Sequence, residues 1–337
     1  MAQPENGRIH TVVLGASAGG IEALRQLIAE LPADFPAAVC VVLHIAPHGP
    51  TVLPQILARA GRLPGVQATD GMAAQGGRIH VAPPDCHLLV ADGTLRLDHG
   101  PRVNGHRPAI DVLFTSAADA YGPSAAGVVL SGVLDDGTAG LMAIKRAGGV
   151  TLVQDPEDAL YDMMPRSAIE IVTPDRVATA PELGRLLGEL ASSLPPLDPP
   201  HVSHSPTELL VEVDRGSSDD PQPGDVTGLT CPECNGAIWL AEKDGIPRLA
   251  CRTGHSFSLE TFAVSQTERV EVALWTALRT LEERAALYRR MAARHRGQGN
   301  TRTAERLALQ SESAVQHAFV IRDVIDRFDD EEEEGAA

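Results

Sequence analysis

Two hydrophobic patterns alternate along residues 9–191. Short segments at 9–14, 38–43 and 127–130 are apolar at nearly every position, which is typical of strands buried on both faces of a parallel sheet. Between these segments, apolar residues recur at helical spacing, as in 21–31. The alternation predicts a doubly wound α/β fold, in which a mostly parallel sheet carries helices on both faces.

Residues 78–97 depart from this alternation. Short apolar segments at 86–90 and 94–97 are joined through Asp92-Gly93, and an Asp-Gly pair is a strong signal for a tight turn between two strands. We therefore expect an antiparallel hairpin within the otherwise parallel fold.

The composition changes beyond the α/β region. Residues 192–230 are rich in Pro, Ser, Asp and Gly, which favours a flexible linker with at most one short strand. A compact cysteine-containing module follows at 231–258. Two heptad-like apolar stripes, separated by a Gly-rich turn, then predict an antiparallel helical hairpin over 260–328. The acidic residues 329–337 are expected to form a disordered tail.

Charge and cysteine content limit the partners. The chain has 337 residues and a net charge of -17, which argues against general affinity for nucleic acid or for an anionic membrane, and no membrane insertion is expected. The sequence shows neither a secretory signal nor an apolar stretch of membrane-spanning length, so we expect a cytoplasmic protein. In a reducing compartment, the five cysteines favour metal binding over disulfides.

The turn after the first predicted strand could hold either a phosphate or a nucleophile. Gly15-Ala-Ser-Ala-Gly-Gly20 lacks the lysine of a mononucleotide P-loop and the full glycine pattern of a dinucleotide site, so nucleotide binding is the weaker interpretation. The segment fits the G-x-S-x-G nucleophile elbow, in which small residues allow a sharp turn that exposes Ser17. A Gly/Ser turn without chemistry is the remaining alternative.

Two further strands favour the nucleophile. Functional groups in open α/β sheets gather beyond the carboxyl ends of the strands. His44 directly follows segment 38–43, and segment 127–130 leads into Ser131-Gly-Val-Leu-Asp-Asp-Gly137. Serine, histidine and aspartate would then meet at one edge, as a catalytic triad requires. Backbone N–H groups of the helix after Ser17 or of loop 132–134 are candidate oxyanion donors. The chain order Ser…His…Asp argues against a generic α/β-hydrolase.

Six segments in colinear order, spread over about residues 8–191, carry a family resemblance. They are Gly15-Ala-Ser-Ala-Gly-Gly20, Leu43-His-Ile-Ala-Pro47, Ile79-His-Val-Ala-Pro83, Arg107-Pro-Ala-Ile-Asp-Val-Leu-Phe114, Leu130-Ser-Gly-Val-Leu-Asp-Asp-Gly137 and Ala147-Gly-Gly-Val-Thr-Leu-Val-Gln154. Together they resemble the catalytic domain of the bacterial chemotaxis protein-glutamate methylesterases (CheB-type).

The resemblance implies both residues and activity. It implies Ser17 as nucleophile, His44 as general base and acid, and Asp136 rather than Asp135 as the orienting carboxylate, with the backbone N–H of Val133 as an oxyanion donor. It further implies hydrolysis of glutamate methyl esters on chemoreceptor helices, with release of methanol and no catalytic cofactor. Deamidation of receptor glutamines is the related activity.

The chain also departs from the pattern of that family. Members commonly carry a phosphorylatable receiver domain first, whereas the pattern here begins almost at Met1, so no control by such a domain is expected. The family's Gly-Met-Gly is Gly132-Val-Leu134 here, and its threonine after the nucleophile is Ala18. The alternative function is a catalytically weak or inactive signalling adaptor that retains the esterase fold and acts through its C-terminal helices.

Four soft ligands are clustered in the module at 231–258. Cys231-Pro-Glu-Cys234 and Cys251-Arg-Thr-Gly-His255 supply three thiols and one imidazole in two short-spaced pairs, which is typical of a closed, structural zinc site. The sequence therefore predicts a zinc-ribbon-like module whose metal, bound by Cys231, Cys234, Cys251 and His255, supplies folding energy. A metal-free β-hairpin module is the alternative, and a redox role is disfavoured because no thioredoxin-like pattern surrounds the cysteines.

The remaining candidates carry weaker signals. Cys40 and Cys86 are interpreted as packing residues and His80 as structural, whereas His87, His99 and His106 are candidates to flank the cleft. Besides methylated receptor helices, the expected partner is a regulatory protein or a second copy bound through the C-terminal helices.

Overall fold

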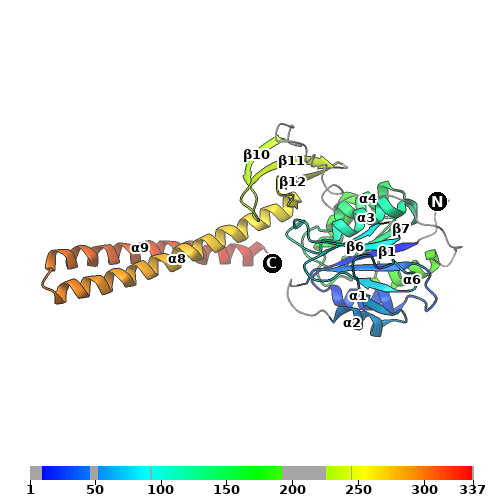
Figure 1. Cartoon of the computed structure of the whole chain (residues 1–337), viewed down its shortest axis with the longest axis horizontal. Coiled ribbons are helices and arrows are strands. Elements are labelled where there is room, and N and C mark those ends of the chain that lie inside the picture. The colour runs from blue at the N-terminus through cyan, green and yellow to red at the C-terminus, as the bar shows by residue number, and fades with distance from the viewer. Residues whose placement is uncertain (1–9, 46–51, 92, 192–224, 244, 336–337) are drawn as a thin grey trace. The chain divides into compact units, whose positions relative to one another are not determined.

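The computed structural model describes residues 10–45, 52–91, 93–191, 225–243 and 245–335. The chain divides into two compact units, one ending at Phe262 and one beginning at Ala263. Figure 1 shows the whole chain.

Seven strands form the central sheet of the first unit, in the order β3-β4-β2-β1-β7-β8-β9, and every pairing within it is parallel. The strands are β1 (Thr11–Ala16), β2 (Ala38–Leu43), β3 (Gly65–Gln67), β4 (Ile79–Val81), β7 (Ala125–Val129), β8 (Val150–Gln154) and β9 (Arg176–Ala178). All residues of β1, β2 and β7 are buried, as their continuous apolar runs predict. The chain leaves β1 toward β2 and returns on its other side at β7, so the topological switch point lies between β1 and β7.

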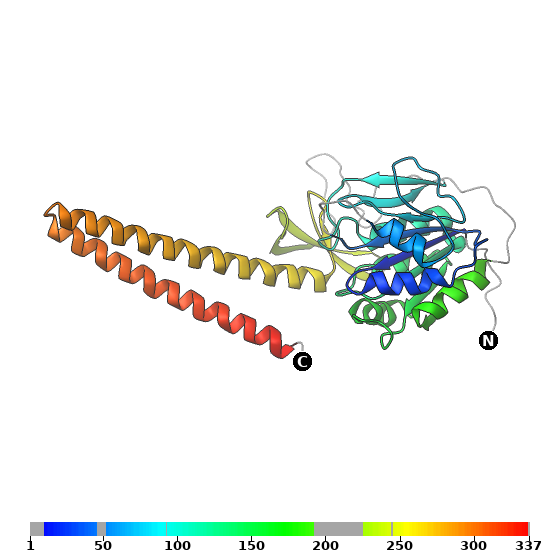
Figure 2. The same ribbon diagram turned by 90° about the horizontal axis from the view of Figure 1, so that it is seen from below.

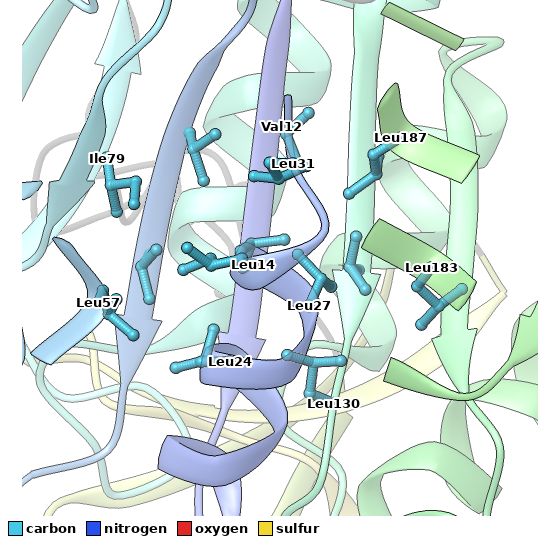
Figure 3. Close-up of a cluster of buried hydrophobic side chains, with 14 of the residues drawn as sticks. Val12, Leu14, Leu24, Leu27, Leu31, Leu57, Ile79, Leu130, Leu183 and Leu187 are labelled. Carbon is cyan, nitrogen blue, oxygen red and sulfur yellow. The ribbon is translucent and has the colours of Figure 1, made fainter. Parts of the chain in front are cut away.

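Helices cover both faces of this sheet (Figure 1). One face carries α1 (Gly20–Ala29), α2 (Leu53–Ala60) and α6 (Ala180–Ala191), and the other carries α3 (Ile110–Tyr121), α4 (Thr138–Arg146) and α5 (Met163–Val172). A hydrophobic core lies on each face of the sheet. Alternate residues of β1 pack into one core or the other, because successive side chains of a strand point to opposite faces. Val12 and Leu14 pack with the first set of helices (Figure 3), whereas Val13 packs with the second. The doubly wound fold is confirmed.

The expected hairpin is also present. Strands β5 (His87–Ala91) and β6 (Thr94–Asp98) pair in antiparallel register and form a sheet of their own. Leu88, Val90 and Leu95 of this hairpin are buried in the core on the α3 side, which explains why it remains attached to the parallel fold.

A four-stranded antiparallel sheet forms the Cys/His module, and it belongs to the same unit as the α/β domain. Its strands are β10 (Asp225–Thr230), β11 (Ala237–Lys243), β12 (Ile246–Cys251) and β13 (Ser256–Phe257). Strand β10 falls inside the stretch predicted as linker, and it is ordered because it pairs with β11. The rest of that predicted linker, 192–224, lies outside the described residues.

The second unit consists of two long helices that lie side by side (Figure 2). They are α8 (Leu259–Gly297), whose first residues belong to the first unit, and α9 (Thr301–Gly335). Leu278, Ala318 and Ile325 are buried between them, and Leu274, Leu281 and Ile321 pack against this cluster. Except for Leu278, these residues belong to the two predicted apolar stripes. The backbone of α9 continues to Gly335, so the acidic residues expected to form a disordered tail are helical up to that point, consistent with the helix propensity of glutamate. Among the described residues, none of the helices has the length and apolarity needed to cross a bilayer.

Candidate active site

Ser17, His44 and Asp136 meet at the carboxyl edge of the central sheet. Ser17 follows β1, His44 follows β2, and Asp136 lies in the loop after β7, so the three residues lie around the topological switch point. His44 Nδ1 is 3.2 Å from Ser17 Oγ, and His44 Nε2 is 2.8 Å from Asp136 Oδ2. The His44 and Asp136 side chains are 7% and 2% exposed, respectively. The structure thus brings together the three residues that the sequence nominated for a triad.

The turn that carries Ser17 requires small residues. Gly19, the N-cap of α1, has φ 71°, and a Cβ at this position would lie 2.7 Å from Ser131 Oγ. A Cβ on Gly20 would lie 2.5 Å from that of Ala16. The backbone N–H of Ser17 donates a hydrogen bond to the Ser131 carbonyl at 2.9 Å. These contacts fix the nucleophile turn against the loop that carries Asp136.

The ring of His44 is placed for proton transfer. When Nε2–H donates to Asp136, Nδ1 offers its lone pair to the Ser17 hydroxyl, which is the arrangement of a general base. His106 stacks on this ring, with 3.6 Å between the ring centroids and 15° between the planes. Burial, followed by the neighbouring His44, lowers the pKa of His106 to about 4. His106 is therefore neutral at neutral pH and does not oppose a positive charge on His44.

Each carboxylate oxygen of Asp136 accepts two hydrogen bonds. Oδ2 accepts from His44 and from the backbone N–H of Ile110 at 2.7 Å, and Oδ1 accepts from Asn104 Nδ2 and the backbone N–H of Asp111, at 3.0 and 3.3 Å. Ile110 and Asp111 open α3, so its N-terminal N–H groups face the carboxylate. Burial by itself would raise the pKa of Asp136, but these hydrogen bonds and the charge of His44 hold it below its usual range. Asp136 therefore stays ionised.

A second buried carboxylate, Asp111, lies behind Asp136. Its Oδ1 accepts hydrogen bonds from the backbone N–H groups of Gly137 and Gly140, at 3.0 and 2.8 Å. Its Oδ2 accepts from Asn104 Nδ2 at 3.1 Å and from Arg248 Nη1 at 3.0 Å. Burial and the charge of Asp136 raise the pKa of Asp111, and Arg248 acts against this rise.

Sequence reasoning missed Asn104 and Asp111 as parts of the site. Asp111 falls within one of the six segments that carry the resemblance. It lies in the first turn of α3, and an acidic residue in the first turn of a helix is also a common surface feature. Its membership of that segment was the available signal. Asn104 stands outside all six segments and gave no such signal.

The loop at 132–134 passes close to the nucleophile. A Cβ on Gly132 would lie 2.9 Å from Ser17 Cβ and 2.0 Å from Met164 Sδ, so the approach of the backbone depends on glycine. The N–H of Gly132 already donates to the Tyr161 carbonyl. Among the described residues, the N–H groups of Ala18, Gly19 and Val133 have no hydrogen-bond partner, which leaves them available to an oxyanion.

The other candidate histidines and thiols do not touch the triad. His80 Nε2 contacts the backbone of Gln75, and His87 accepts a hydrogen bond from the N–H of Ala109 while its Nε2 faces the Pro101 carbonyl. His99 contacts the thiol of Cys86. Cys40 is fully buried, and burial raises the pKa of its thiol to about 12, so this thiol stays protonated. Of the four histidines considered, His106 is the one that contacts His44.

The four residues nominated as metal ligands also come together. Their ligand atoms all lie within 4.8 Å of one another. Cys234 Sγ is 3.6 Å from Cys251 Sγ, and His255 Nδ1 is 3.5 Å from Cys251 Sγ and 3.7 Å from Cys231 Sγ. A tetrahedron with Zn–S bonds of ~2.3 Å and a Zn–N bond of ~2.0 Å has edges of about 3.5–3.8 Å. The donor set fits zinc, and these three distances match the edges of such a tetrahedron.

The α/β part of the chain is similar to known proteins. Residues 12–187 match the family described as CheB methylesterase. The protein-glutamate methylesterase/protein-glutamine glutaminase 2 of Anaeromyxobacter dehalogenans is 43% identical over 183 residues, which cover 54% of each chain. A shorter protein of Leptospira interrogans is 38% identical over 52% of this chain and 91% of its own length.

A solved structure is similar as well. The crystal structure of the Thermotoga maritima CheB methylesterase catalytic domain is 34% identical, covers 55% of this chain and 100% of its own, and gives a TM-score of 0.52. The chain spans about half the length of the Anaeromyxobacter relative, at 54%. The Cys/His module and the two long helices begin after the last matched residue, 187.

Proposed function

The chain belongs to the CheB methylesterase family, and we propose that it is a serine hydrolase that demethylates glutamate methyl esters on chemoreceptor-like proteins and deamidates their glutamines. The observation that carries this proposal is the pair of hydrogen bonds that links Ser17, His44 and Asp136. It gives a nucleophile, a base and an orienting carboxylate in one connected arrangement.

The proposed reaction proceeds through an acyl-enzyme. Ser17 Oγ attacks the ester carbonyl carbon while His44 Nδ1 accepts the hydroxyl proton. The tetrahedral intermediate collapses, the ester C–O bond breaks, and His44 returns the proton to the departing methoxide, which leaves as methanol. Water then attacks the acyl-enzyme, His44 accepts its proton, and Ser17 recovers it when the free glutamate leaves. With a glutamine side chain, ammonia is the leaving group.

The chain's other residues support each step. Asp136, held ionised by its hydrogen-bond donors, stabilises the imidazolium that forms on His44. The N–H groups of Ala18, Gly19 and Val133 are the proposed donors to the oxyanion, where charge develops in the transition state. The proposed reaction uses no cofactor.

Substrate recognition is assigned to an apolar rim beside the nucleophile, made of Val133, Leu160, Tyr161 and Met163. All four side chains are exposed, between 38% and 76%. Leu160 and Tyr161 pack against Gly19, two residues from Ser17. Exposed apolar side chains in this position suit the apolar face of an amphipathic receptor helix. A substrate on the cytoplasmic helices of receptors would place the enzyme in the cytoplasm.

Ser17→Ala tests the proposal. Methanol release from a methylated receptor fragment is expected to fall by roughly 10³-fold or more, because loss of a triad nucleophile removes the covalent route. Ser167→Ala, on α5, is the matched control and is expected to keep full activity. Equal release by the wild type and Ser17→Ala would remove Ser17 from the mechanism.

A fluorophosphonate probe distinguishes an enzyme from an adaptor. Such probes label activated serines, so the wild type is expected to be labelled at Ser17, and Ser17→Ala is not. The complete set of hydrogen bonds around His44 gives no support to a catalytically inactive adaptor.

The Cys/His module is proposed to hold one structural zinc ion. Cys231, Cys234, Cys251 and His255 would form a closed shell, which leaves no open position for chemistry on a substrate. When bound, the ion supplies folding energy to a module whose own apolar cluster is small.

A further inference from the structure

The carboxylates beside His44 contact a segment far outside the matched α/β residues. Arg248, on β12 of the Cys/His module, is 3% exposed, and its Nη1 donates a hydrogen bond to Asp111 Oδ2 at 3.0 Å, across 137 positions of sequence. Asp111 and Asp136 accept hydrogen bonds from the same Asn104 amide group. Arg248 is therefore connected to Asp136 through two intermediate side chains.

The module also sets the orientation of Asn104. Asn104 Oδ1 accepts a hydrogen bond from the backbone N–H of Ser258 at 3.0 Å, and the backbone N–H of Asn104 donates to the Ser256 carbonyl at 2.8 Å. An amide whose oxygen is engaged in this way must turn its NH₂ group toward the two carboxylates. The Cys/His module thereby decides which side of the amide meets Asp136.

Further contacts attach the module beside Asp136. Ser258 Oγ and Thr261 Oγ1 both donate hydrogen bonds to Asp135 Oδ1, at 2.8 and 3.0 Å. Asp135 is the residue before Asp136 in the loop after β7. Ala250 of β12 is buried in an apolar cluster with four residues of the α/β domain, Leu89, Val103, Ala109 and Val112. The attachment is therefore both polar and apolar.

Charge explains why a cation stands at this position. Asp111 and Asp136 are buried and share one amide, and two negative charges in a poorly polarisable interior repel each other. Arg248 is buried as well and forms an ion pair with Asp111. Without Arg248, Asp111 would either take up a proton or move away from Asp136. Both outcomes alter the hydrogen bonds that Asn104 makes to Asp136.

We propose that the Cys/His module completes the catalytic site, and that Arg248 is a positioning residue that acts on Asp136 through Asp111 and Asn104. The inference rests on the proposed esterase function. Since Arg248 keeps Asp136 oriented toward His44 and has no part in the apolar rim, its removal affects turnover and leaves substrate binding intact.

Arg248→Met and Asn104→Gly test this inference. Asn104 has φ 51°, which glycine adopts without strain, so Asn104→Gly removes the amide at little backbone cost. Each change is expected to lower kcat for a methylated receptor fragment by about 10- to 100-fold, with KM within about 2-fold, because misorientation affects the reacting groups. Arg248→Lys keeps the positive charge, so its kcat is expected to lie well above that of Arg248→Met and close to that of the wild type. Arg252→Met, at an exposed arginine of the same module, is the matched control.

The double variant separates positioning from a general stabilising role. If Arg248 acts through Asn104, then adding Arg248→Met to Asn104→Gly lowers kcat by less than about 2-fold further, whereas independent effects would multiply. Multiplied losses, or a wild-type kcat in either single variant, would overturn the inference. If circular dichroism shows that Arg248→Met does not fold, the kcat of Asn104→Gly decides by itself. Failure of the proposed function appears differently, as full methanol release by Ser17→Ala.

Discussion

Leu134 carries a conflict between its side chain and its backbone. It has φ 63°, in the left-handed region that favours glycine, and it stands where the CheB-type pattern has glycine. A β-carbon in this conformation costs roughly 1–2 kcal/mol. The strain lies in the loop that passes close to Ser17, two residues before Asp136.

We therefore expect position 134 to tolerate glycine with little loss of stability. Leu134→Gly relieves the strain while losing part of a half-buried side chain and adding chain entropy, so its unfolding free energy is expected to stay within about 1 kcal/mol of the wild type. Leu186→Gly, at a half-buried leucine inside α6, gains no such relief and is expected to lose about 2 kcal/mol. Urea unfolding of both variants measures the difference, and equal losses would mean that the loop stores no strain.

The three triad residues that the sequence nominated share one property, which is their position relative to a strand. Ser17 and His44 directly follow strands β1 and β2, and Asp136 lies in the loop after β7, so strand ends alone bring them together. Asn104 and Asp111 depend on tertiary contacts instead. The partner of Asp111 is 137 positions away, and no local pattern indicates that a distant arginine will neutralise it.

At the scale of elements, the strands that the sequence predicts best are the fully buried ones. Strands β1, β2 and β7 are buried throughout, and their apolar runs showed it. The edge strands β3 and β9 have three residues each with exposed or half-exposed side chains, so their pairing with neighbours defines them and their composition does not. Strand β10 is a similar case, because it exists through its pairing with β11.

Metal removal tests the Cys/His module as an element. Purified protein is expected to contain about one zinc ion per chain, and Cys231→Ser is expected to contain little, because one of four ligands is lost. Chelation should increase hydrogen exchange in β10–β13 while leaving the central sheet protected. Cys86→Ser, at a thiol outside the cluster, is the matched control. A wild type that holds no metal and keeps its exchange protection after chelation would contradict the zinc proposal.

At the scale of the whole molecule, the Cys/His module belongs with the α/β domain. The Pro- and Ser-rich composition of 192–230 predicts a flexible linker between the α/β domain and the Cys/His module. The domain and the module nevertheless belong to one compact unit. The composition of a connecting segment carries no information about whether the two domains that it joins have complementary surfaces. Here the complementarity resides in a buried ion pair, in hydrogen bonds to Asp135 and in a small apolar cluster, none of which has a local signature.

The apolar rim determines how a whole substrate protein would meet this molecule. Leu160 is 76% exposed and packs by its β-carbon beside Gly19, so Leu160→Ser removes apolar contact area without disturbing the core. Burying a leucine against a partner contributes about 1.5–3 kcal/mol, so KM for a methylated receptor fragment is expected to rise roughly 10-fold or more. The value of kcat should change little, because the triad is untouched.

A control and a second substrate make this prediction specific. Ile171→Ser, at a residue of α5 that is 42% exposed and outside the rim, is expected to leave KM unchanged. The rate of fluorophosphonate labelling at Ser17 should be the same in Leu160→Ser and the wild type, because the small probe does not need the rim. An unchanged KM in Leu160→Ser would place receptor recognition elsewhere on the surface. A loss in kcat or in probe labelling would instead mean that Leu160 supports the nucleophile turn itself.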